Sequence, residues 1–418
     1  MSGDSRKTMG FMIGYNLIYL GVNYLWISYE TMILPTQVSS LVPLARTSLV
    51  LGITASIGNA AGILGNLSSG FMVDRIIKRS GRRYILIGVG IAGVLLALIF
   101  EMLALSSLIL IIAGYVLIQA FSNIAMGAVQ PIVAEMHNEA DRGTSAGFNG
   151  LFSLMGSAMG FGITSLFLNS GFYGHAIFSL MIGIAVTGTG SALIIERNDM
   201  AGRSAARYVP DHETIIRPQD MKVFSFFSLG SFFVFSGITG LTYFELFFFK
   251  IVLKSPNPDL LVGIVGITVL AISAMSSVVV AHFSNKIGRW QILQIAAVSA
   301  SIPTFIIPLF HNFYVFLVLG SIIGSAYGSF YSVSFALAGE LALHRNSGRS
   351  IAFFYLSISV ASALSPFIYG IIIFIFRNTV NSGYSELFLC SGILYLIGAA
   401  VLNLTGRRMK REDADGSA

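Results

Sequence analysis

The sequence predicts an all-α membrane protein with twelve transmembrane helices arranged as two pseudo-symmetric six-helix bundles. Three observations predict this fold: an apolar composition, long uninterrupted apolar runs, and polar loop patterns that recur in both halves. The 418-residue chain is 55% hydrophobic and only 11% charged, and its mean hydropathy is +0.80. Soluble domains carry about 25% charged residues, so we expect lipid to surround much of this chain.

Each apolar run is long enough to cross a bilayer, whose hydrocarbon core requires about 20 helical residues. The runs are continuous and lack the strand-like alternation of a transmembrane barrel, so they favour helices. The predicted spans are 9–38, 48–74, 84–105, 107–136, 145–170, 175–196, 222–252, 260–284, 290–310, 313–343, 350–376 and 387–406.

The longest polar stretch of the interior lies between the sixth and seventh spans. We interpret it as a linker, which divides the chain into an N-terminal bundle (1–196), a cytoplasmic linker (197–221), a C-terminal bundle (222–406) and a cytoplasmic tail (407–418).

Lys and Arg residues concentrate in alternate loops and at both termini. Cytoplasmic loops carry an excess of these residues, so the pattern predicts cytoplasmic termini and a multi-pass protein of the cell membrane. Basic residues that face anionic lipid explain the pI near 9.4 without a nucleic-acid partner. Of the 25 Lys and Arg residues, all but four lie on the predicted cytoplasmic side; the four are Arg46, Lys250, Lys254 and Arg377.

Two loop motifs occur once in each half. Asp74-Arg75 and Gly81-Arg82-Arg83 follow the second span, and Asn285 and Gly288-Arg289 follow the eighth. Glu135 lies at the end of the fourth span and Arg142 follows it; Glu340 and Arg349 occur in the same way around the end of the tenth, at nearly the same interval from the first copy. Internal repeats of this kind are typical of transporters.

These motifs resemble those of the major facilitator superfamily over nearly the whole chain. The wider spacing between Asp74 and Gly81 is similar to that of sucrose transporters and of glycoside–pentoside–hexuronide cation symporters. The resemblance implies that the motif loops latch the two halves in an outward-facing state. Solvated charges that only anchor the topology are the alternative interpretation. The predicted latch residues are Asp74, Arg75, Gly81, Arg82, Arg83, Glu135, Arg142, Asn285, Arg289, Glu340 and Arg349.

Two carboxylates fall at corresponding places in the first span of each half. Glu30 and Glu245 both neighbour aromatic residues, and ionisable residues inside a bilayer are functional candidates. In the resembling family the first helix of each half lines the central cavity, where a carboxylate could bind a proton or accept hydrogen bonds from sugar hydroxyls. Both could instead lie near the outer interface. We interpret Glu101, near the outer end of the third span, as an interface residue.

Uncharged polar and aromatic residues within the spans are the other candidates for solute binding. Ring faces pack on the C–H surfaces of sugars and amides bind their hydroxyls, although buried amides can also simply bridge helices. The candidates are Asn23, Trp26, Gln119, Asn123, Asn149, Tyr243, Tyr327 and Tyr331.

Glycines recur at every fourth residue in several spans. Such spacing lets helices approach closely, either as static packing or as a sliding contact. The positions are Gly58 and Gly62, Gly156 and Gly160, and Gly320, Gly324 and Gly328.

Taken with the resemblance, these features predict a secondary active transporter that works by alternating access. The favoured solute is a sugar or glycoside taken up with protons or another cation; alternatives are an exporter of amphipathic compounds and a non-transporting sensor. We expect a functional monomer without enzymatic activity, cofactor or metal, since no soluble domain is large enough for catalysis and Cys390 is the single cysteine.

Overall fold

The computed structural model describes residues 9–80, 82–103, 107–133, 139–201, 218–343 and 347–415. These residues are almost entirely helical. The chain divides into two compact units: unit 1 comprises Met1–Val42 and Ile57–Pro210, and unit 2 comprises Pro43–Ser56 and Asp211–Ala418.

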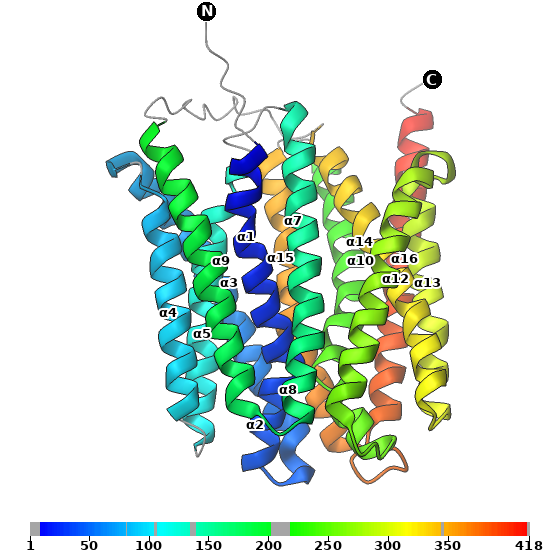
Figure 1. Cartoon of the computed structure of the whole chain (residues 1–418). Helices are drawn as coiled ribbons and strands as arrows, with labels where there is room; N and C mark the ends of the chain where they lie inside the picture. Colours follow the sequence, from blue (N-terminus) through cyan, green and yellow to red (C-terminus); the bar gives the residue numbers. More distant parts are fainter. Residues whose placement is uncertain are drawn as a thin grey trace, which may run out of the picture. The chain divides into compact units, whose positions relative to one another are not determined.

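Unit 1 contains the first half of the chain. Its helical segments are α1 (Met9–Ser28), η1 (Tyr29–Ile33), α2 (Leu34–Leu41), most of α3 (Leu44–Ser80), α4 (Tyr84–Leu103), α5 (Leu108–Val129), α7 (Glu139–Met159), η2 (Gly160–Thr164), α8 (Ser165–Asn169) and α9 (Tyr173–Ala201). The central helix α1 packs along both α7 and α9, and α4 packs along α5 and α9 (Figure 1).

Unit 2 repeats this plan. It contains α10 (Pro218–Thr242), α11 (Glu245–Phe247), η3 (Phe248–Val252), α12 (Pro258–Ile287), α13 (Arg289–Ile306), η4 (Ile307–Leu309), α14 (Phe313–Leu343), α15 (Ser347–Ile375) and α16 (Tyr384–Asp415). Here α10 packs along α15 and α16, and α14 packs along α12 and α13.

Eleven helices of the described chain are long and apolar enough to cross a membrane. The twelfth predicted span, 9–38, corresponds to α1, η1 and α2, which follow one another without a break. Tyrosines and asparagines in α1 lower its hydropathy, and the same polar groups make it a candidate for function. The all-α fold is therefore confirmed.

The segment Pro43–Ser56 groups with unit 2 although it begins α3. A Cβ atom on Gly52 would collide with the backbone at Pro366 and Gly370 of α15, so the glycine permits a very close approach. The predicted division at 197–221 lies largely outside the described residues and stays a prediction.

Glycine spacing predicts the close helix packing in most cases. A Cβ atom added to Gly58 would collide with the Tyr115 ring. One added to Gly156 would collide with the Leu20 carbonyl, and one added to Gly328 with the Ser273 carbonyl. Gly320 is an exception, because a Cβ atom there would make only ordinary contacts.

Three π-helical turns interrupt the helices of the described chain: η1, η2 and η3. Turns of this type are frequent at functional sites. In unit 1, η1 and η2 lie against each other, since Thr164 Oγ1 donates a 2.7 Å hydrogen bond to Ser28 Oγ at the start of η1. In unit 2, η3 follows Glu245 by three residues, so a π turn accompanies each of the paired carboxylates.

Candidate functional site

Glu30 lies in the π turn η1 and is partly buried. Its Oε1 atom accepts a 2.6 Å hydrogen bond from Gln119 Nε2 and a 3.3 Å hydrogen bond from the Tyr115 hydroxyl. Both donors come from α5. The carboxylate is thus held inside unit 1 by neutral donors, as an ionisable group in a membrane helix requires.

Gln119 is the centre of this network. It is 3% exposed, and its Nε2 atom also lies 2.8 Å from Tyr115 Oη and 3.4 Å from Asn59 Oδ1 of α3. Asn123 Nδ2 donates to the Gln119 backbone oxygen at 2.9 Å and approaches its Oε1 atom at 3.4 Å. Tyr115, Gln119 and Asn123 are spaced by four residues, which puts them on one face of α5.

The other candidates on α1 bind neighbouring helices. Trp26 Nε1 donates a 3.0 Å hydrogen bond to Ser122 Oγ on α5. Asn23 Nδ2 donates to Ser153 Oγ on α7 at 3.2 Å, and this hydroxyl in turn donates to Asn149 Oδ1 at 3.4 Å. Glu30, Trp26, Asn23, Gln119, Asn123 and Asn149 are therefore all brought into polar contacts within unit 1.

Glu101 requires a correction, because we interpreted it as an interface residue. The structure buries it fully, at 0% exposure. Its Oε2 atom accepts a 2.8 Å hydrogen bond from Gln37 Nε2, whose Oε1 atom accepts a 3.0 Å bond from the Tyr29 hydroxyl. These two partners come from η1 and α2 at the end of the first span. Nothing in the local sequence around Glu101 indicates them.

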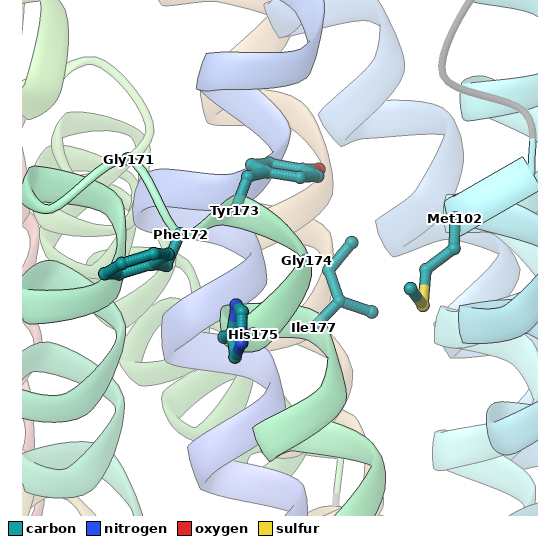
Figure 2. Close-up of a pocket in the computed structure, with 7 residues that line it drawn as sticks. All are labelled: Met102, Gly171, Phe172, Tyr173, Gly174, His175 and Ile177. Atoms are coloured by element: carbon teal, nitrogen blue, oxygen red, sulfur yellow. The ribbon is translucent and has the colours of Figure 1, made fainter.

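A surface hollow opens beside this cluster. It is lined by Met102 at the end of α4 and by residues around the start of α9, of which Figure 2 labels Gly171, Phe172, Tyr173, Gly174, His175 and Ile177. Tyr173 lines the hollow while its hydroxyl is buried and has no hydrogen-bond partner among the described residues.

Unit 2 presents a different chemistry at the corresponding place. Tyr243 is buried, and Glu245 begins α11 after a break in the helix. The Glu245 Oε1 atom is buried without a hydrogen-bond partner among the described residues. The two carboxylates paired by the repeat are therefore in unlike surroundings.

Tyr327 and Tyr331 belong to a row of aromatic rings in unit 2. Their ring centroids are 5.8 Å apart, and each lies 6.3 Å from Phe235. The row continues from Tyr331 to Phe335 at 4.5 Å and from Phe335 to Tyr355 at 5.3 Å. Tyr331 is 45% exposed, so part of this aromatic row lies at the surface of unit 2.

The predicted latch is described only in part. Arg289 and Glu340, both predicted latch residues, form an ion pair in unit 2. Arg75 and Arg82 are exposed, and Arg83 is buried. Gly81 and Glu135 lie outside the described residues, as do the side chains of Asp74, Arg142, Asn285 and Arg349.

Sequence reasoning missed Asn59, Tyr115, Ser122 and Ser153, which complete the polar contacts of unit 1. The four-residue spacing from Gln119 could have identified Tyr115. The described residues contain no group of three His, Cys, Asp or Glu side chains suited to a metal ion.

Comparison with solved structures gives matches over nearly the whole chain. A bacterial homolog of the human lysosomal transporter Spinster, inward-facing and occupied, has a TM-score of 0.68 at 14% identity, covering 96% of each chain. The nucleoside transporter NupG has a TM-score of 0.67 at 14% identity, covering 95% of this chain and 99% of the other. At such identities the likeness concerns the fold alone. No curated protein sequence matches the chain.

Comparison with protein families gives one match that spans most of the sequence. The model described as Major Facilitator Superfamily matches residues 11–313 and 258–417. Together with the helical architecture, this match shows that the chain belongs to the Major Facilitator Superfamily.

Proposed function

We propose that this transporter is a proton-coupled symporter that takes up a sugar or glycoside by alternating access. The observation that carries the proposal is the hydrogen-bonded network around Glu30 in unit 1. It combines a carboxylate with amide and hydroxyl groups from three helices.

The chemistry of unit 1 suits a polyhydroxylated solute. Gln119, Asn59 and Asn123 each carry both donors and acceptors, so they can exchange their mutual hydrogen bonds for bonds to solute hydroxyls. The side chains of Asn59 and Asn123 are only partly buried, so both keep some exposed surface. The Trp26 ring is also partly buried and supplies an aromatic face one helical turn from Glu30.

Glu30 is the proposed coupling residue. As a carboxylate it accepts hydrogen bonds from Gln119 and Tyr115. Proton binding would turn one of its oxygens into a donor, so the bonds to these two neighbours would rearrange. Loading of the proton is thereby linked to the groups proposed to hold the solute.

Export of amphipathic compounds is the second candidate function. The aromatic row of Tyr327, Tyr331, Phe335 and Tyr355 in unit 2 favours it, since aromatic rings pack well against the apolar parts of a solute. The polar network of unit 1 favours a sugar as the solute. We rank sugar uptake above export because this network includes an ionisable group.

The test is uptake by the purified full-length protein in proteoliposomes. Sugars, glycosides, nucleosides and amphipathic cations are compared with and without an inward proton gradient. We expect gradient-driven accumulation of a sugar or glycoside; accumulation of only amphipathic compounds would overturn the proposed solute class.

Glu30→Gln tests the coupling role. This variant keeps the shape of the side chain and removes its ability to exchange a proton, so we expect loss of gradient-driven uptake with counterflow retained. Glu386→Gln is the matched control, because its carboxylate bonds to Thr379 in an exposed position. Unchanged driven uptake in Glu30→Gln would exclude the coupling role.

The same proposal includes cytoplasmic termini, residence in the cell membrane and function as a monomer. It also retains the latch and the kinship with sucrose and glycoside–pentoside–hexuronide symporters. Labelling of cysteines introduced at Asn381 and Lys286 in a Cys390→Ser background tests the topology. Labelling of both positions from one side of the membrane would contradict it.

A further inference from the structure

Glu101 occupies a slot that the neighbouring helix leaves open for it. The carboxyl group lies against Gly114 of α5, where an added Cβ atom would collide with Glu101 Oε1 and with the carbon that bears it. The side chain is 0% exposed and lies within a span apolar enough to cross the membrane. The backbone of α5 thus accommodates an acidic group deep in the protein.

The polar groups that face Glu101 are all neutral. Gln37 of α2 donates to Oε2, Tyr29 of η1 bonds to Gln37, and Tyr173 of α9 lies within electrostatic range. From α5, Glu101 meets Gly114 and the backbone at Tyr115. Among the described residues no Lys, Arg or His pairs with it, and its Oε1 atom has no hydrogen-bond partner.

Such surroundings favour a carboxyl group that carries a proton. A buried charge without a cation is costly, and an acid in this position escapes the cost by becoming neutral. Protonation also makes the unpartnered oxygen a potential donor. Tyr173, which lines the hollow of Figure 2, is a nearby polar residue; its hydroxyl is buried and has no hydrogen-bond partner in the described chain.

A continuous series of side-chain contacts joins Glu101 to Glu30. Gln37 bonds to both Glu101 and the Tyr29 hydroxyl. The Tyr29 ring lies parallel to that of Tyr115, with centroids 5.4 Å apart and planes 3° from parallel. The Tyr115 hydroxyl then donates to Glu30. The two carboxyl groups are therefore joined by a series of packed and hydrogen-bonded neighbours.

We propose that the Glu101 carboxyl group is a second proton-binding site of this protein, linked to Glu30 through Gln37, Tyr29 and Tyr115. Its role in coupling rests on the proposed symport, whereas proton binding itself does not.

Infrared spectroscopy of the full-length protein in lipid detects this proton directly. The C=O stretch of a protonated carboxylic acid at neutral pH shifts when H2O is replaced by D2O. We expect this band in the wild type and in Glu386→Gln, and its loss or reduction in Glu101→Gln. An undiminished band in Glu101→Gln would overturn the proposal.

Gln37→Met is a second variant, which keeps the Glu101 carboxyl group and removes the amide that donates a hydrogen bond to it. We expect the C=O band of Glu101 to persist at a higher frequency, because the group has lost a hydrogen bond. An unchanged frequency would contradict the assignment even if Glu101→Gln failed to fold.

Transport assays separate this proposal from the role of Glu30. We expect Glu101→Gln to shift the pH dependence of counterflow while counterflow itself continues; an unshifted profile would overturn the link to Glu30. If Glu30→Gln left driven uptake intact while Glu101→Gln removed the infrared band, the Glu30 coupling role would fail and the Glu101 site would stand.

Discussion

The packing of α12 against α14 should be sensitive to a single methyl group. A Cβ atom on Gly328 would fall against the carbonyl oxygen and carbon of Ser273 on α12, closer than van der Waals contact allows. The nearest atoms belong to the backbone, which cannot change rotamer to relieve the clash as a flexible side chain could. Gly328→Ala must therefore move α14 away from α12.

The cost follows from two destabilising effects and one stabilising effect. Overpacking of this kind costs about 1–3 kcal/mol. Separation of the helices also weakens the hydrogen bonds of Ser276 to Ser325 O at 2.8 Å and to Ser329 Oγ at 2.6 Å, about 1 kcal/mol for a neutral bond. Alanine recovers about 1 kcal/mol of helix propensity. We expect a net loss of about 1–3 kcal/mol.

Thermal unfolding of the purified protein in detergent measures this loss. Gly320→Ala is the matched control on the same helix, because its new Cβ atom would lie 3.8 Å from Phe316 and Val269, an ordinary contact. We expect Gly328→Ala to lower the melting temperature by roughly 2 °C or more and Gly320→Ala to leave it unchanged or raise it. Equal melting temperatures for the two variants would refute the reasoning.

Two further predictions concern hydrogen bonds and charges. Tyr29→Phe keeps the ring and removes the 3.0 Å bond to Gln37, so we expect a loss of about 1 kcal/mol in the same unfolding assay; wild-type stability would show that the bond contributes nothing. Arg289 and Glu340 form a partly exposed ion pair, so a double-mutant cycle with Arg289→Gln and Glu340→Gln should give a coupling energy of about 0–1 kcal/mol. A coupling energy well above this would contradict a solvent-screened pair.

The helical fold could be predicted because it depends on features that the sequence carries locally. Apolar runs of span length placed the helices, and the recurrence of Gly-Arg and Glu motifs indicated the duplication. The predicted fourth span, 107–136, runs past the end of α5, which is Val129, and its predicted end lies outside the described residues.

The surroundings of the candidate residues were harder to predict. Glu30 and Glu245 correspond in sequence, yet Glu30 has amide and hydroxyl partners while Glu245 Oε1 has none in the described chain. Glu101 accepts a hydrogen bond from Gln37, which lies 64 residues away in sequence. Such pairings arise from tertiary packing, which one sequence does not reveal.

The π turn at Tyr29–Ile33 sets the rotational phase of the first span. A π turn holds one more residue than an α turn, and each residue advances an α-helix by about 100°. If the same five residues formed a regular α-helix instead, Gln37 would turn about a quarter-turn away from Glu101, while Met9–Ser28 kept its own partners. The widened turn therefore lets the two ends of one helix serve two separate hydrogen-bonding neighbourhoods.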